Sequence, residues 1–267
     1  MQDYTYVKII DYYRSQNLQT KADYKSFLDH FSVLFAYNSG VIENQEITYH
    51  DTREIFENGK IINYTGNLKT LYEISNQKDC YDYLVDNIVL KTPISESFIK
   101  KIHKILTKGT YDEDRYVKNN ERPGEYKKHD YVTGKNEIGS SVENVSKEIK
   151  ELVEEINSVD SNDIETVFTL VAYAHNVFES IHPFADGNGR VGRVLMNYIL
   201  MIHQLPPIII YDEDKKFYYE ALEKYDDSED LSSTIKFFHY EMEKTWKKKL
   251  ELIDAKKIQR KKLDELM

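Results

Sequence analysis

The chain has 267 residues, and its 36 Lys and Arg against 46 Asp and Glu give a formal net charge of −10. Ten glycines and five prolines are too few for a sandwich, a propeller or another fold of many tight turns, so the composition favours long helices. With 31% charged and 40% hydrophobic residues, a soluble globular protein is expected. The acidic balance argues against nucleic acid or an anionic membrane as the main partner.

Cys80 is the single cysteine, so no disulfide can form within the chain and a reducing compartment fits best. The first residues lack the basic and apolar regions of a secretory signal, and the apolar runs are too short to span a membrane. A cytoplasmic location is therefore expected. Histidine and cysteine pairs at metal-ligand spacing are absent from the sequence.

In chain order, residues 1–31 and 41–60 are predicted as short helices around a turn at Asn38-Ser39-Gly40. A helix with Thr92 or Ser95 as its cap is predicted to follow, ending before Gly109. A turn at 122–124 and the pattern over 126–138 predict a β-hairpin. Apolar residues at helical spacing predict the remaining helices, over 63–90, 143–157, 167–181, 191–202, 213–226 and 231–265.

The two most strongly periodic helices, 167–181 and 191–202, flank a loop that contains most of the candidate chemistry. It reads SIHPFADGNGRVGR from Ser180 to Arg193, and three of the ten glycines fall within 187–192. Glycines permit a backbone curled around an anion, and the loop opens a helix whose N-terminus favours negative charge. This predicts an anion-binding loop.

Four side chains of the loop suit a nucleotide polyphosphate. Arg190 and Arg193 lie one helical turn apart and have the planar forks that bind phosphate. Asp186 offers a hard oxygen ligand, which beside phosphates indicates Mg²⁺. His182 is the group that can accept a proton near neutral pH. The alternative for any one of them is a structural role at a helix corner.

The loop resembles the signature of the Fic family, His-Pro-Phe-x-Asp/Glu-Gly-Asn-Gly-Arg-x-x-Arg, and matches it at every position. The resemblance covers about residues 95–240 and implies an all-α fold, the Fic fold, with one small β-hairpin that serves as a flap. It divides the chain into an N-terminal helical region with an inhibitory helix (1–94), a Fic core (95–240) and a C-terminal helix (241–267).

By this resemblance the protein is an adenylyltransferase that moves AMP from ATP to the hydroxyl of a target protein and releases pyrophosphate. His182 would deprotonate the hydroxyl, and Asp186 would hold Mg²⁺ as the cofactor. Arg190 would bind the β-phosphate and Arg193 the γ-phosphate. The anion hole would be lined by Gly187, Asn188 and Gly189.

The family's pattern also assigns residues to the base and to the target. Tyr218 and Tyr219 would lie at the nucleotide, as would Asp226, which stands where many relatives have an asparagine. An aspartate accepts from the adenine amino group but cannot donate, and an exposed helix surface is the alternative for these residues. The hairpin would dock an extended target segment by strand addition through Tyr131, Val132, Thr133 and Gly134.

Many Fic proteins carry an inhibitory helix with the pattern Ser/Thr-x-x-x-Glu-Gly/Asn, and Ser39, Glu43 and Asn44 fit it. Glu43 would pair with Arg193 and so occupy the place of the γ-phosphate. The alternative is a helix start with Ser39 as the N-cap and Glu43 in solvent.

Three other functions stay open at this stage. The loop could transfer phosphate, UMP or phosphocholine; the protein could chiefly remove AMP, with Glu43 as general base; or it could be a non-catalytic nucleotide-sensing module. The 22 tyrosines offer many acceptors for self-modification. The target, the modified residue and the formation of a homo-oligomer are not determined by the sequence.

Overall fold

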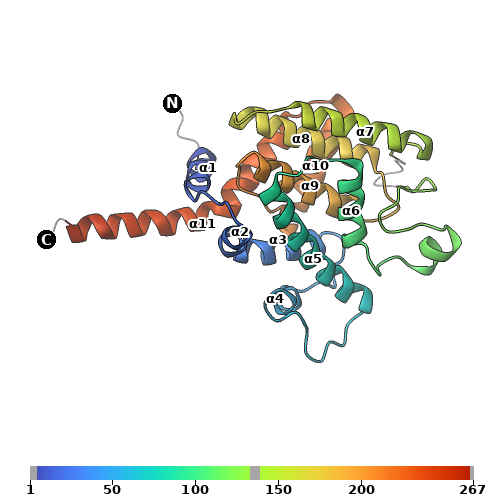
Figure 1. Ribbon diagram of the computed structural model, residues 1–267, viewed down its shortest axis with the longest axis horizontal. Helices are drawn as coiled ribbons and strands as arrows, with labels where there is room; N and C mark the ends of the chain where they lie inside the picture. The colour runs from blue at the N-terminus through green and yellow to red at the C-terminus, as the bar shows by residue number, and fades with distance from the viewer. Residues whose placement is uncertain (1–4, 133–138, 265–267) are drawn as a thin grey trace.

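The computed structural model describes residues 5–132 and 139–264, and in this part of the chain helices are the regular secondary structure and no strand occurs (Figure 1). This agrees with the predicted all-α class. The helices are α1 (Thr5–Ser15), α2 (Lys21–Phe27), α3 (Asp29–Val41), α4 (Tyr49–Asn58), α5 (Leu68–Leu90), α6 (Glu96–Leu106), η1 (Asp114–Lys118), α7 (Val142–Ser158), α8 (Ile164–Ile181), α9 (Asn188–Ile202), η2 (Asp212–Asp214), α10 (Lys215–Ser228) and α11 (Ser232–Asp264).

Helices α8 and α9 form the centre of the molecule. Every residue of α9 from Arg190 to Met201 is buried, and α8, which packs along it, has ten buried residues of its own. Helices α3, α5 and α6 pack on α9, whereas α7, α10 and α11 pack on α8. The loop between α8 and α9 therefore lies at one end of a buried helix pair.

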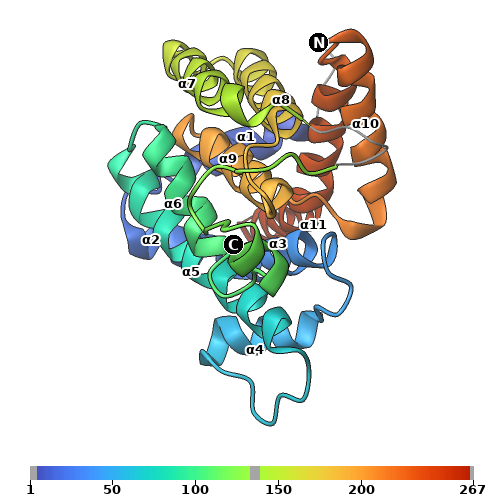
Figure 2. The ribbon, with the colours of Figure 1, turned by 90° about the vertical axis from the view of Figure 1, so that its right-hand side faces the viewer.

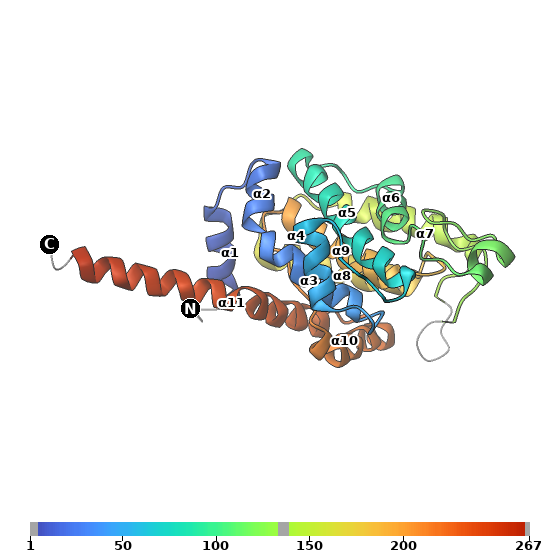
Figure 3. The same ribbon diagram turned by 90° about the horizontal axis from the view of Figure 1, so that it is seen from below.

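The outer elements extend from this centre in different directions. Figure 2 shows α4 and the loop that follows it at the opposite end of the molecule from α7. Figures 1 and 3 show the C-terminal half of α11 projecting away from the body beyond α1 and α2. Within the described residues, no helix combines the length and the apolar character that crossing a bilayer requires.

Helix ends follow the predicted local chemistry in several places. Ser95 is the N-cap of α6, as predicted, because its hydroxyl accepts from the backbone N–H of Phe98. Asp163 caps α8 in the same way through Thr166. The predicted boundary between a core and a C-terminal helix at 240 falls inside α11, which is continuous from Ser232 to Asp264.

One prediction of local structure is wrong in the described residues, and a second, the β-hairpin, is not confirmed there. Asn38-Ser39-Gly40 is not a turn but the last part of α3, so Ser39 does not begin a helix. At Gly40 a Cβ would lie 2.8 Å from Ile47 Cδ1, so this glycine marks a close contact between side chain and helix and not a bend. No strand occurs over 126–132, where bonds to neighbouring loops replace the predicted pairing; 133–138 lie outside the described residues.

Candidate active site

The signature loop is a tight connection between the end of α8 and the start of α9. His182 caps α8 in the left-handed region with φ 50°, and Gly187 takes φ 84° immediately before α9. A Cβ on Gly187 would lie 2.7 Å from Thr107 Cγ2, so the end of α6 packs directly on the loop. Glycine at 187 thus satisfies both the backbone conformation and the close contact.

Phe184 and Asn188 hold the loop in shape. The Phe184 ring is fully buried, and both backbone polar groups of this residue bond to the Asn188 side chain: its N–H donates to Oδ1 at 2.9 Å and its carbonyl accepts from Nδ2 at 2.7 Å. The amide of Asn188 is therefore used within the loop, and what Asn188 presents to an anion is its backbone N–H at the first turn of α9.

His103 on α6 is a structural residue of the site that the sequence did not reveal. Its ring stacks on Phe184 with a centroid separation of 3.7 Å and an interplanar angle of 2°. The Gly124 N–H donates to Nδ1 at 2.8 Å, which assigns the ring proton to Nε2, and Nε2 then donates to the Asp186 carbonyl at 3.0 Å. Burial lowers the pKa of His103 to about 3, so the ring stays neutral.

Arg193 is buried against the segment that contains the inhibitory pattern. Its Nε donates to Ser39 Oγ at 3.0 Å, and its Nη2 donates to the Ser39 carbonyl at 2.9 Å and to Glu43 Oε1 at 2.7 Å. Although burial alone would raise it, the Arg193 guanidinium holds the pKa of Glu43 below its usual value. The ion pair anticipated between Glu43 and Arg193 is thus present.

Arg190 faces two carboxylates. Its Nη2 lies 3.4 Å from Asp186 Oδ1, and its Nη1 lies 3.6 Å from Glu73 Oε1 on α5. Glu73 also accepts from Asn44 Nδ2 at 2.7 Å, which gives the third residue of the inhibitory pattern a contact of its own. Glu73 was not anticipated, because nothing in the local pattern of α5 distinguishes it from other helical carboxylates.

The two later glycines of the loop are close-approach sites and not bends. Gly189 and Gly192 lie within α9, so only Gly187 supplies the positive φ that the sequence suggested for several. A Cβ on Gly189 would lie 2.7 Å from Glu43 Oε1, and one on Gly192 would lie 2.2 Å from Glu179 Oε1. The first turns of α9 therefore carry no side chain at these two positions, and the Glu43 carboxylate lies close to Gly189.

His182 is half-buried at the start of the loop. Burial and the nearby Lys127 ammonium lower the pKa of His182 to about 4, against a hydrogen bond to the backbone of Glu179 that raises it. A neutral imidazole can accept a proton from a hydroxyl. Burial also raises the pKa of the Glu179 carboxyl, to about 7.

The residues assigned to the base lie on α10. Tyr218 is buried and its hydroxyl bonds to His175 Nε2 at 2.8 Å, whereas Tyr219 is 40% exposed. Asp226 lies two turns further on, where its Oδ1 accepts from the Ser180 hydroxyl at 2.8 Å. The three residues therefore belong to one helix, in which Tyr218 contacts the interior of α8 and Asp226 contacts its end.

The predicted flap is tied to the signature loop at both of its ends. The Lys127 N–H donates to the Pro183 carbonyl at 2.9 Å, and the Ser140 N–H donates to the Ile181 carbonyl at 3.0 Å. Tyr131 donates to Glu121 Oε1 at 3.1 Å, and Val132 is 71% exposed. Thr133 and Gly134 lie outside the described residues.

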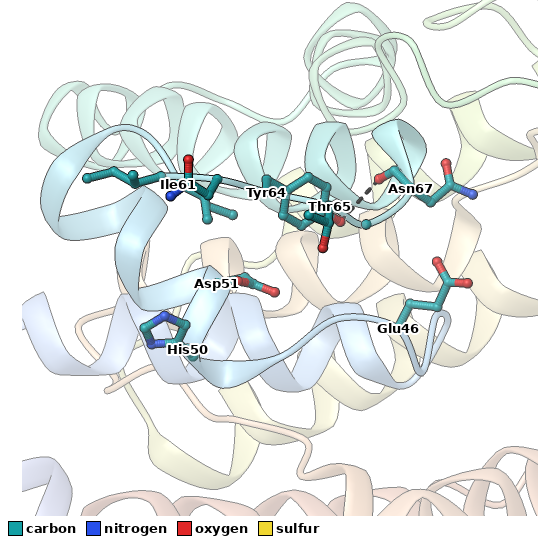
Figure 4. Close-up of a pocket in the computed structure, with 10 residues that line it drawn as sticks. Glu46, His50, Asp51, Ile61, Tyr64, Thr65 and Asn67 are labelled. Atoms are coloured by element: carbon teal, nitrogen blue, oxygen red, sulfur yellow. Dashed lines mark hydrogen bonds between the residues drawn. The ribbon is translucent and has the colours of Figure 1, made fainter.

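A surface pocket of about 520 Å³ lies apart from this site, between α4 and the loop that leads to α5 (Figure 4). Glu46, Asp51 and Tyr64 are among its lining residues, and the Tyr64 hydroxyl donates to the Asn67 carbonyl at 3.1 Å. It includes none of the residues that the sequence assigned to the nucleotide.

A metal at this site would depend on Asp186. In the described part of the chain, no group of three or more His, Cys, Asp or Glu side chains could hold a metal ion by itself. Mg²⁺ commonly binds through one or two carboxylates together with substrate phosphates, so a lone aspartate beside an anion site fits it. The Asp186 side chain is 25% exposed and so accessible to such an ion.

Residues 93–200, which include this loop and the helices that flank it, match the model of the Fic/DOC family. It is 27% identical over 250 residues to the protein adenylyltransferase Fic of Drosophila persimilis, which covers 90% of this chain and 47% of that protein. It is 37% identical over 82 residues to protein adenylyltransferase fic-1 of Caenorhabditis elegans, covering 31% of this chain and 16% of that protein. The chain spans about half the length, or less, of these curated relatives.

Solved structures show the same fold. A Fic domain containing signaling protein from Bacteroides thetaiotaomicron superposes with a TM-score of 0.75 at 24% identity, covering 90% of this chain and 92% of that one. Fic-1 from C. elegans (residues 134–508) superposes with a TM-score of 0.72 at 20% identity, covering 94% and 73%. These similarities establish the Fic fold predicted from the signature.

Proposed function

We propose that this chain is a protein adenylyltransferase that transfers AMP from ATP to hydroxyl side chains of target proteins and of itself, with Glu43 as an internal brake. The observation that carries the proposal is the bond from Arg193 to the Glu43 carboxylate beside the N-terminus of α9, in the helix that follows the loop begun by His182. The names of the related proteins support the same activity.

In the proposed reaction the target oxygen attacks the α-phosphorus of ATP, and the bond from that phosphorus to the pyrophosphate oxygen breaks. His182 takes the hydroxyl proton, which its lowered pKa allows because the ring is neutral near pH 7. Catalysis then depends mainly on positioning and on neutralising charge, as is general for transfer at phosphorus.

The positive groups of the site suit the phosphates. The first N–H groups of α9 have no partner within their own helix, and Arg193 Nη1 is buried without a hydrogen-bond partner in the described structure. Arg190 would bind the β-phosphate and Arg193 the γ-phosphate. Asp186 would hold Mg²⁺, which when bound supplies further neutralisation of phosphate charge.

The target would dock at the flap. The backbone bonds from Lys127 to Pro183 and from Ser140 to Ile181 hold the chain on both sides of the flap against the signature loop. A target strand added along the flap would then present its hydroxyl near His182. We place this activity in the cytoplasm, because the single cysteine, Cys80, is free and buried.

The test uses ATP labelled at the α-phosphate with three proteins: the wild type, Glu43→Gly, and Glu43→Gly combined with His182→Ala. We expect Glu43→Gly to label itself or proteins of a lysate, with a mass increase of one AMP, and the double variant to do neither. Label from the γ-phosphate, or a mass increase of another group, would replace AMP transfer by a different transfer. Release of AMP from a modified target by the wild type would favour the hydrolase.

A further inference from the structure

The segment that carries Ser39 and Glu43 is held from a second side, by the beginning of α10. Lys215, the first residue of α10, donates through its ammonium group to the backbone carbonyl of Ile42. Ile42 is the C-cap of α3 and directly precedes Glu43. The lysine thus reaches across the fold to the residue next to the carboxylate that engages Arg193.

This contact satisfies a real need of α3. The last carbonyls of a helix have no partner within it, and a cation there also interacts favourably with the negative end of the helix dipole. For α10 the same lysine is unfavourable, because a positive charge in the first turn opposes the dipole of that helix. Lys215 therefore serves α3 and not the helix it belongs to.

Lys216, the next residue of α10, provides a comparison, because its side chain makes no recorded bond outside its own helix in the described structure. The Lys216 side chain is 82% exposed, and the ion pair recorded for it is with Glu220 on its own helix, at 3.8 Å. Lys215, by contrast, is half-buried and bonds to a residue 173 positions away. Two adjacent residues of one type thus differ in exposure and in their contacts, since Lys215 reaches Ile42 and the ring of Tyr219, 5.8 Å away, whereas Lys216 pairs within its own helix.

Two further bonds join the same regions. The Asp212 N–H donates to Asn38 Oδ1 at 3.1 Å, and Gln45 Nε2 donates to Asp212 Oδ1 at 3.4 Å. Contacts to Asn38, Ile42 and Gln45 bracket the residues Ser39 and Glu43. The junction of η2 and α10 is therefore a support for the segment 38–45.

We propose that Lys215 is a positioning residue that holds Glu43 against Arg193. The proposal rests on the proposed function, in which the Glu43–Arg193 pair is the brake. Loss of the Lys215 bond leaves the Ile42 carbonyl without its cation and frees the end of α3 to move away from Arg193. Because α10 also carries Tyr218 and Tyr219, the support of the brake and the residues assigned to the base belong to one rigid element.

The experiment replaces Lys215 with Met in the full chain, in the wild type and in Glu43→Gly, and uses Lys216→Met as the matched control. We expect Lys215→Met to raise AMP transfer about tenfold in the wild type, which is the lower end of the effect of losing a hydrogen bond to a charged group. In Glu43→Gly it should change nothing, because no brake remains to be positioned. Lys216→Met should match the parent protein, and Lys215→Arg should restore the braked rate.

An unchanged rate in Lys215→Met, or an equal rise in both backgrounds, would overturn the proposal while leaving the adenylyltransferase in place. Hydrogen exchange gives a readout that needs no catalysis. The N–H groups of Glu43 and Asn44 both donate to the Gly40 carbonyl, at 3.0 and 2.9 Å. Their exchange should accelerate in Lys215→Met and not in Lys216→Met, and equal protection in the two variants would refute the role of Lys215 even if no transfer were found.

Discussion

Replacing Glu43 by Gly tests the central electrostatic contact of the site. The substitution removes a carboxylate that accepts from Arg193 at 2.7 Å and leaves the two bonds from Arg193 to Ser39 intact. Arg193 is 1% exposed, so its charge has few alternative partners, whereas the Glu43 side chain is 36% exposed and its bond is partly screened.

The expected increase in AMP transfer follows from the burial of Arg193 and the partial exposure of Glu43. A hydrogen bond to a charged group contributes about 1.5–3 kcal/mol, and partial solvation of Glu43 places this one near the lower value. About 1.4 kcal/mol corresponds to a tenfold change, so AMP transfer should rise at least tenfold. Repulsion between the carboxylate and the phosphates, which the same substitution removes, adds to the increase.

Arg193→Ala, and the double variant that combines it with Glu43→Gly, complete a double-mutant cycle. Since the released site needs Arg193 for the γ-phosphate, the double variant should resemble Arg193→Ala and not Glu43→Gly. Glu46→Gly is a suitable control, because Glu46 is an exposed carboxylate three residues further on that accepts from Thr70. Incorporation of labelled AMP is measured for all variants at fixed ATP and Mg²⁺. An unchanged or reduced rate in Glu43→Gly, with a melting temperature equal to that of Glu46→Gly, would refute the brake.

Three other results are expected. His182→Ala should lower AMP transfer about 10²–10⁴-fold while calorimetry finds ATP binding retained; near-normal transfer would exclude His182 as the base. Asp186→Asn should lose both transfer and its dependence on Mg²⁺, since an amide is a weak ligand for a hard cation, and a wild-type Mg²⁺ titration curve would show that Asp186 binds no metal. Because the pKa of His182 is lowered to about 4, the imidazole stays unprotonated between pH 8 and 6 and transfer by Glu43→Gly should be nearly constant there. A histidine with the usual pKa would instead cost about fourfold by pH 6.

The parts of the site that could be predicted from sequence are those whose residues lie close together along the chain. The signature loop, its flanking helices and the Ser95 cap of α6 all depend on neighbours within a few turns. The Glu43–Arg193 contact spans 150 positions, and it could be anticipated only because the resemblance supplied a pattern for both partners.

The residues that were missed act through the tertiary structure. His103, Glu73 and Lys215 each meet the site from a different helix, and their local sequences read as ordinary helix. The error at Gly40 has the same origin: Asn-Ser-Gly is a typical turn signal, yet these residues belong to α3, and Ile47 packs close to the position that a Cβ of Gly40 would take. Where segments far apart in the sequence pack together, tertiary packing overrides the local preference of the sequence for a turn or a helix.

The charges gathered here support the proposal that the resting state is the braked one. Arg190 and Arg193 provide two positive charges, and Glu43, Glu73 and Asp186 surround them with three negative ones. A triphosphate approaching this set meets arginines that are already neutralised, whatever the geometry of the loop. Removing Glu43 and adding a divalent cation at Asp186 change this balance in the same direction, one by subtracting a negative charge and the other by adding positive charge. In the proposed mechanism the loop therefore holds the phosphates in a productive pose only when one or both of these changes has occurred, and the signature motif alone does not achieve it.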